Sequence, residues 1–262
     1  MKARFYFMRM TLILCLSFFS LTLWSDNEGK KLNIMFIGNS ITQGVLLENP
    51  EKQAPPVKCV NWLETQLGVE KISFFNAGRS GCTTIDFLPE TNSLFPWMKI
   101  EADKLAKNKG VLLFSIMLGT NDSAINGTKG APVEAGQYRE NMRKIINKLL
   151  DLYPKAIIVL NDPLWYSPNT YNGAMYLVAG QKRLLEYIPE LRRLVGEYAQ
   201  KFPGQVKTGD TEAYKYFKEY YRTDMVAEDG NAGVFYLHPN DKGGSRLAEY
   251  WGQAILRAIG KE

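Results

Sequence analysis

Residues 32–40 read LNIMFIGNS, a mostly apolar run that ends at Gly38 and is followed at once by two small polar residues, Asn39 and Ser40. A short apolar segment that stops at a glycine is typical of a buried parallel strand. In folds built from such strands, functional residues follow the carboxyl ends of the strands. The segment therefore predicts an α/β protein and makes Ser40 a candidate functional residue.

Similar apolar segments alternate with helical patterns along the rest of the chain. Strands are expected at 32–37, 71–75, 111–117, 156–160 and 205–208, and helices at 57–67, 94–107, 133–152, 179–202 and 241–259. A long loop is expected at 161–178. This alternation predicts a three-layer α/β/α sandwich around a mostly parallel five-stranded sheet, in a single domain.

The first 25 residues have the composition of a secretory signal peptide. Lys2, Arg4 and Arg9 precede an apolar run over 10–23 that is short for a membrane span. We expect cleavage to leave one domain, 26–262, in a secreted or periplasmic protein; an uncleaved anchor is the alternative. Removal of the segment lowers the formal net charge from +5 to +2, so neither a nucleic-acid partner nor a stable membrane span is expected.

Histidine and cysteine are scarce. His238 is the only histidine, which excludes zinc sites and haem sites that need two or three imidazoles. No metal or other cofactor is expected, but one imidazole is enough to serve as the base of a serine hydrolase. Beyond the signal segment the cysteines are Cys59 and Cys82, and either a disulfide or two free thiols is compatible with the sequence.

Residues suited to acyl transfer follow the predicted strands. Ser40 follows the first strand, Gly81 lies in the segment after the second, and Asn121 lies in the segment after the third, while His238 precedes the last helix. A serine hydroxyl needs a base to become a nucleophile. The oxyanion that then forms needs preorganised N–H donors, which a close backbone approach at glycine and an asparagine amide can supply.

In this order, the four residues resemble the four sequence blocks of the SGNH (GDSL-like) hydrolase superfamily, over about 31–260. Asn39 stands where the motif that names the family has aspartate, and we align Gly81, not Gly78, with the family's oxyanion glycine. The resemblance implies a flavodoxin-like fold, Ser40 as nucleophile and His238 as base. It implies an oxyanion hole made by Ser40, Gly81 and Asn121. The Gly-x-Ser-x-Gly elbow of α/β-hydrolases is absent.

The acid that orients the histidine departs from the family pattern. The family places aspartate three residues before the histidine, where this chain has Phe235. If 231–236 is an inserted loop, Asp229 takes the place of that aspartate, and we predict Asp229 as the acid. Asp224, Glu228 and a backbone carbonyl remain alternatives.

The substrate is predicted from the same resemblance and from the aromatic residues of the 161–178 loop. Relatives include carbohydrate acetylesterases, lysophospholipases and thioesterases. Trp165 and Tyr166, with Tyr171 and Tyr176, are expected to offer stacking surfaces for sugar rings, although core packing is the alternative. We therefore expect a secreted esterase that removes small acyl groups, O-acetyl above all, from carbohydrate. A lysophospholipase or thioesterase, and a catalytically degenerate glycan-binding protein, remain as alternatives.

Overall fold

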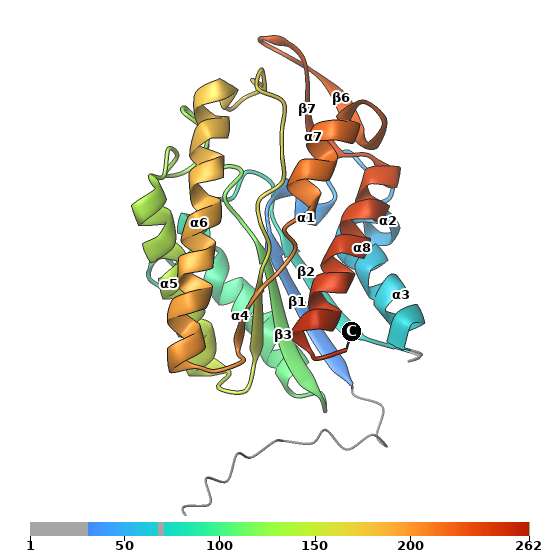
Figure 1. Ribbon diagram of the computed structural model, residues 1–262, viewed down its shortest axis with the longest axis vertical. Coiled ribbons are helices and arrows are strands. Elements are labelled where there is room, and N and C mark those ends of the chain that lie inside the picture. Colours follow the sequence, from blue (N-terminus) through green and yellow to red (C-terminus); the bar gives the residue numbers. More distant parts are fainter. Residues whose placement is uncertain (1–30, 68–70, 262) are drawn as a thin grey trace, which may run out of the picture.

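A central parallel sheet organises the molecule (Figure 1). The computed structural model describes residues 31–67 and 71–261, so the predicted signal peptide lies outside the described residues. The strands of the sheet are β1 (Leu32–Gly38), β2 (Ser73–Gly78), β3 (Val111–Met117), β4 (Ile157–Leu160) and β5 (Val206–Thr208). They lie in the order β2-β1-β3-β4-β5, and every neighbouring pair is parallel. The predicted five-stranded sheet is confirmed.

Helices cover both faces of the sheet, which confirms the three-layer prediction. They are α1 (Ser40–Gln43), α2 (Pro50–Gln53), α3 (Pro55–Leu67), α4 (Leu94–Ala106), α5 (Ala135–Leu152), α6 (Leu177–Lys201), α7 (Ala213–Asp224) and α8 (Asp241–Ala258), with 3₁₀ turns at Thr84–Phe87 and Pro89–Thr91. Helices α4, α5 and α6 pack on one face, and α3, α7 and α8 on the other. No helix among residues 31–67 and 71–261 is long and apolar enough to cross a membrane.

Strands β1 to β4 contribute to two separate cores, one on each face of the sheet. Successive side chains of a strand point to opposite faces, so Met35 and Ile37 of β1 join the core under α4–α6, whereas Ile34 and Phe36 join the core under α3 and α8. The Phe36 ring stacks on Trp251 of α8 with 5.9 Å between centroids. Burial on both faces explains why β1 is apolar almost throughout.

The two cysteines belong to different cores and form no bond with each other. Cys59 lies in the α3 layer and Cys82 in the opposite layer, and both are free and buried. The Cys82 thiol donates a hydrogen bond to the Gly38 carbonyl at 3.2 Å. Because the sheet separates them, the disulfide that the sequence left open is not formed.

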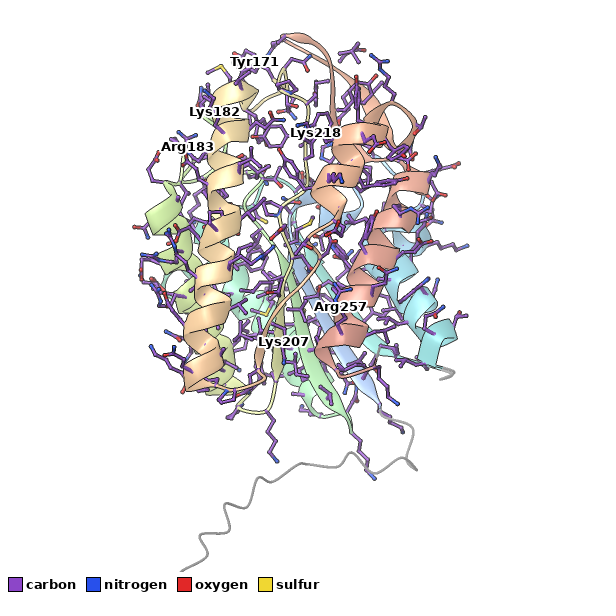
Figure 2. The ribbon with its side chains drawn as sticks, in the orientation of Figure 1. Tyr171, Lys182, Arg183, Lys207, Lys218 and Arg257 are labelled. Atoms are coloured by element: carbon purple, nitrogen blue, oxygen red, sulfur yellow. The ribbon has the colours of Figure 1, made fainter. Side chains whose placement is uncertain are left out.

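A β-hairpin, helix α7 and the short helices α1 and α2 were not expected from the sequence. Strand β6 (Met225–Gly230) pairs antiparallel with β7 (Gly233–Pro239), directly after α7. Residues 231–236, expected as an inserted loop, thus form the turn and most of β7. The hairpin holds the 161–176 loop through a hydrogen bond from Asn231 N–H to the Tyr171 carbonyl at 2.8 Å. Figure 2 shows Tyr171 at this end of the molecule, and Lys207 and Arg257 towards the other.

Candidate active site

Ser40 is held at the carboxyl end of β1 by a short, tightly packed turn. Asn39 caps helix α1, because its side-chain oxygen accepts a hydrogen bond from Ile41 N–H at 3.0 Å. A Cβ at Gly38 would lie 1.9 Å from Thr42 Oγ1, so only glycine fits there. The replacement of the family's aspartate by Asn39 therefore keeps the oxygen that caps the helix and places Ser40 in its first turn.

His238 contacts Ser40 directly. Its Nε2 lies 2.9 Å from Ser40 Oγ, although 198 positions separate the two residues in the chain. His238 is in β7. Both residues are buried: His238 is 6% exposed and Ser40 is 7% exposed. The structure thus brings together the predicted nucleophile and the predicted base at hydrogen-bond distance.

Glu228, not Asp229, is the carboxylate beside the histidine. Glu228 Oε1 lies 2.9 Å from His238 Nδ1 and also accepts a longer bond from the His238 backbone N–H, at 3.3 Å. A carboxylate only accepts hydrogen bonds, so Nδ1 carries the proton and Nε2 is left as the acceptor for the serine hydroxyl. This tautomer is the one that general-base catalysis requires.

The prediction of Asp229 as the acid is wrong because of strand geometry. Asp229 is opposite Val234 in the hairpin and is exposed, and adjacent residues of a strand point to opposite faces. The hairpin folds Glu228 back beside a histidine ten residues later. Gly230, Asn231 and Gly233 lie between two short segments that begin with apolar residues, 225–229 and 234–237, and a glycine- and asparagine-rich break of this kind is a turn signal. Read as a hairpin rather than as an insertion, these residues would have placed Glu228 and Asp229 on opposite faces of one strand, and the packing of β7 then decides which of the two faces His238.

Gly81 and Asn121 lie with Ser40 and His238 around one cavity of about 370 Å³. The cavity is lined by Ser40, Ser80, Gly81, Asn121, Thr128, Asn172, Gly173, Ala174, Tyr176, Leu237 and His238. Gly81 has φ +75°, a conformation that favours glycine. Gly78 has a different role, since a Cβ there would lie 2.3 Å from the backbone nitrogen of Gln43. All four residues predicted from the motif blocks therefore meet at this cavity.

The Asn121 side chain is held at both of its polar atoms. Its Nδ2 donates to the Cys82 carbonyl at 2.7 Å, and its Oδ1 accepts from the Tyr176 hydroxyl at 2.7 Å. Nδ2 has a second hydrogen, for which the described residues provide no acceptor. The amide can therefore offer one N–H to a substrate oxygen in the cavity.

Asp122 is fully buried immediately beneath Asn121. Its Oδ1 accepts bonds from both the backbone N–H and the hydroxyl of Thr84, while Oδ2 has no partner among the described residues. Burial raises the pKa of the Asp122 carboxyl to about 6, against the opposing effect of the Thr84 bonds. This residue links the third motif block to the turn after β2 and does not contact Ser40 or His238.

Trp165 and Tyr166, predicted to bind substrate, are core residues. Trp165 is 5% exposed and packs on Tyr221 with 5.3 Å between ring centroids. Tyr166 is fully buried, and its hydroxyl lies 2.9 Å from Ser123 Oγ. Neither lines the cavity. Of the aromatic residues in that loop, Tyr176 is the one that does.

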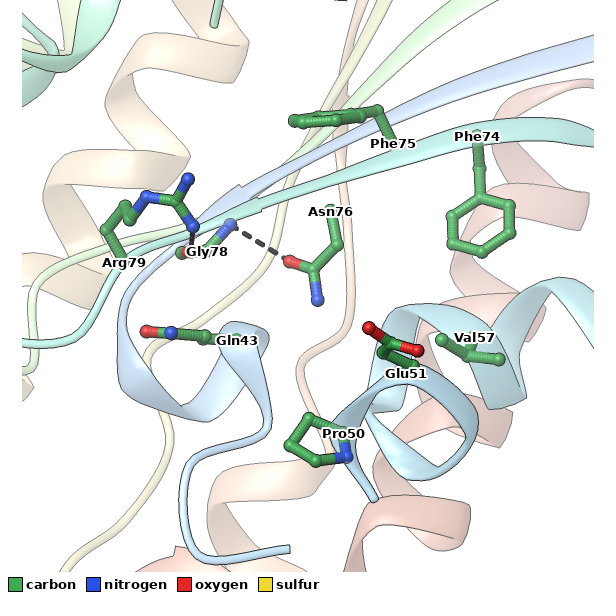
Figure 3. A pocket seen from close by; sticks show the side chains of 9 residues that line it. All are labelled: Gln43, Pro50, Glu51, Val57, Phe74, Phe75, Asn76, Gly78 and Arg79. Carbon is green, nitrogen blue, oxygen red and sulfur yellow. Dashed lines mark hydrogen bonds between the residues drawn. The ribbon is translucent and has the colours of Figure 1, made fainter. Parts of the chain in front are cut away.

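A second cavity, of about 360 Å³, lies beside the first at the outer edge of the sheet (Figure 3). It is lined by Gln43, Pro50, Glu51, Val57, Phe74, Phe75, Asn76, Gly78 and Arg79. The Arg79 guanidinium lies 4.0 Å from the ring centroid of Trp97. Gln43 joins the two cavities structurally, because its Oε1 accepts a bond at 2.7 Å from the backbone N–H of Ser80, which lines the first.

Solved structures of esterases have the same fold. Est24, a carbohydrate acetylesterase from Sinorhizobium meliloti, aligns with 87% of this chain and 99% of its own at TM-score 0.58 and 17% identity. The M. smegmatis aryl esterase aligns with 86% of this chain and 99% of its own, at TM-score 0.54 and 17% identity. A two-domain esterase (CEX) active on acetylated mannans aligns over 89% of this chain and 51% of its own, at TM-score 0.53 and 20% identity.

The sequence comparisons are consistent with this fold. No curated protein matches the chain. The pattern of the GDSL-like Lipase/Acylhydrolase family matches residues 36–245, a span that begins in β1 and ends in α8 and includes Ser40, Gly81, Asn121 and His238. With most of its length matched and its sheet arranged as in these esterases, the chain belongs to the GDSL-like lipase/acylhydrolase family, whose members are the SGNH hydrolases.

Proposed function

We propose that this protein is a secreted serine esterase that removes small acyl groups, acetyl above all, from carbohydrate. The observation that carries the proposal is the chain of contacts from Ser40 through His238 to Glu228, at a cavity where Gly81 and Asn121 also lie. These groups supply a nucleophile, a base, a carboxylate and N–H donors, which together are the requirements for ester hydrolysis by an acyl-enzyme.

The reaction proceeds in two halves. His238 Nε2 takes the Ser40 hydroxyl proton while Oγ bonds to the ester carbonyl carbon, and the oxyanion is held by the N–H groups of Ser40, Gly81 and Asn121. The intermediate collapses, its C–O bond breaks, and the leaving alcohol takes the proton from Nε2. Water then gives a proton to Nε2 and attacks the acyl group, and Ser40 leaves with that proton. Glu228 stabilises the imidazolium in both halves.

The lining of the cavity supports the proposed preference for a small acyl group. Apart from Leu237 and the ring of Tyr176, its walls are made of small or polar side chains such as Thr128, Ala174 and Asn172. A long acyl chain would find little apolar surface there, and apolar contact is what holds such chains. This lining favours an acetylesterase over a lysophospholipase or a long-chain thioesterase.

The choice of carbohydrate as the alcohol rests on different support. Est24 and the esterase active on acetylated mannans have the same fold. Phe75, Glu51 and Arg79 all line the second cavity, and a cavity with both an aromatic ring and charged groups suits a sugar, which has apolar faces and hydroxyl edges. We propose that the sugar next to the acetyl group binds along this edge of the sheet. Trp165 and Tyr166, which the sequence suggested for this role, are buried and do not bind it.

Replacement of Ser40 by alanine tests the mechanism. The variant should fold as the wild type does, because alanine is a good helix former in the first turn of α1, but it should release no acetate from an aryl acetate or an acetylated glycan. A fluorophosphonate probe should label the wild type and not Ser40→Ala. Failure of the wild type to react with the probe would instead favour a degenerate glycan-binding protein.

Chain-length dependence tests the substrate class. With aryl acetate, butyrate and octanoate at equal concentration, kcat/KM should fall by about tenfold or more from acetate to octanoate, because the cavity holds no apolar tunnel. Acetate release from a panel of acetylated polysaccharides then identifies the glycan. A preference for octanoate would contradict the proposal.

Sequencing of the N-terminus of the mature protein tests the proposed secretion, which requires removal of the signal segment.

A further inference from the structure

Among the described residues, the Tyr176 hydroxyl makes one hydrogen bond, and its partner is the predicted oxyanion asparagine, Asn121. The side chain is 3% exposed and lines the catalytic cavity. Its hydroxyl donates to Asn121 Oδ1 at 2.7 Å, and its ring packs against Tyr166 at 5.2 Å between centroids. A buried hydroxyl directed at the amide, rather than at the core, needs an explanation beyond packing.

The backbone on both sides of Tyr176 is strongly held. Met175 pairs with Asn126 through two backbone hydrogen bonds, and the Tyr176 N–H donates to the Thr170 carbonyl at 3.2 Å. The next residue, Leu177, has φ +52°, a left-handed conformation that persists only where its surroundings impose it. The ring therefore enters the cavity from a fixed point, and its hydroxyl is not free to follow a moving amide.

We propose that Tyr176 is a positioning residue of the oxyanion hole, whose hydroxyl holds the Asn121 amide so that one Nδ2 hydrogen faces the developing oxyanion. The inference rests on the proposed esterase function and assigns to that site a residue outside the four motif blocks. Two bonds determine the orientation of the amide: Cys82 accepts from Nδ2, and Tyr176 donates to Oδ1. A hydrogen bond donated to the amide oxygen also polarises the amide and strengthens its remaining N–H as a donor.

The electrostatic surroundings keep the phenol in its donating form. Burial, together with the nearby negative charges of Glu228 and Asp122, raises the pKa of the Tyr176 hydroxyl above its ordinary value. The hydroxyl is therefore protonated throughout the pH range in which a serine esterase works. Its bond to Asn121 is present in every catalytic state of His238.

Removal of the hydroxyl tests the proposal. In Tyr176→Phe, kcat for an aryl acetate should fall by about fivefold to tenfold with KM nearly unchanged, because the lost bond supports the transition state more than the bound ester. Tyr198→Phe is the matched control: the Tyr198 hydroxyl also donates to an asparagine Oδ1, that of Asn147, but between α5 and α6. This control should keep kcat within about twofold.

A double-mutant cycle separates positioning from a structural role or from direct contact with substrate. Asn121→Ala should lower kcat by about 10²–10³-fold. Adding Tyr176→Phe to that variant should lower kcat by less than about twofold more, because a residue that acts through Asn121 has nothing left to position. If the two losses multiply in full, or if Tyr176→Phe changes KM alone, the proposal is overturned.

Two further outcomes are distinguishable. Tyr176→Met removes the same hydroxyl and should show the same loss and the same lack of additivity, so the test survives if Tyr176→Phe folds poorly. An active wild type with an unaffected Tyr176→Phe overturns only this inference. A wild type that hydrolyses no aryl acetate overturns the proposed function and this inference with it.

Discussion

At the scale of single residues, the predicted groups that the structure brings together at the cavity lie in short segments near the ends of regular elements. Ser40 follows β1 within two residues, and Asn121 follows β3 closely, so their positions depend on short, local turns. Trp165 and Tyr166 were placed wrongly because an aromatic residue in a loop suits a core as well as a binding surface. Composition cannot tell these apart, because burial is set by contacts with distant residues such as Tyr221.

Asp122 gives a residue-scale prediction about pH. Its pKa is raised by burial to about 6 in the folded protein, against about 3.9 for an unfolded chain. A carboxyl with a raised folded pKa favours folding at low pH, and this contribution is lost as pH rises from about 4 to about 6. Relative to Asp122→Asn, wild-type unfolding free energy should fall by on the order of 2–3 kcal/mol over that range.

Urea unfolding at pH 4, 5, 6 and 7 measures the effect, with Asp122→Asn as the reference that cannot titrate. Asparagine keeps the oxygen that accepts from Thr84 and puts its amide where Oδ2 has no partner. The free energy of unfolding of the wild type minus that of Asp122→Asn should therefore decrease steadily from pH 4 to pH 6. Parallel pH profiles for the two proteins would rule out the buried carboxyl as the cause.

At the scale of elements, the hairpin β6–β7 selects the carboxylate that faces His238. Glu228 and Asp229 are adjacent and chemically alike, but the alternation of a strand directs them to opposite sides. The register is irregular between Met225 and Ala227, which is where the hairpin leaves α7. A pattern in the sequence can predict the hairpin, but the side that faces the histidine depends on how β7 packs against α1 and the sheet.

This geometry predicts different effects for two neighbouring substitutions. Glu228→Gln should lower kcat/KM for an aryl acetate by about 10²–10⁴-fold, because the imidazolium loses its counter-charge and the ring its preferred tautomer. Asp229→Asn, the matched control on the exposed side of the same strand, should stay within about twofold. Steady-state kinetics on both folded variants decide the matter. A large loss in Asp229→Asn with little in Glu228→Gln would mean that the hairpin pairs in another register.

At the scale of the whole molecule, the sheet explains why the residues around the cavity meet and why the two cysteines do not. Parallel strands place all their carboxyl ends at one edge, so segments from β1, β2 and β3 meet there although they lie far apart in the chain. The same sheet separates Cys59 from Cys82. Family membership is consistent with this arrangement, because the matched residues 36–245 include each segment that reaches the cavity.

Local patterns were enough to predict the strands of the central sheet, its five long flanking helices and the edge where the site lies. Together with the family resemblance, they predicted that Ser40, Gly81, Asn121 and His238 lie at that edge. Those features depend on hydrophobic periodicity and on short turns, and both are patterns of residues that lie close together in the sequence. Three features were decided only by tertiary structure: the contact of Glu228 with His238, the contact of Tyr176 with Asn121 and the burial of Trp165. Each depends on the packing of segments that are distant in the sequence. The free energy of that packing depends on both segments together, so neither segment alone predicts it.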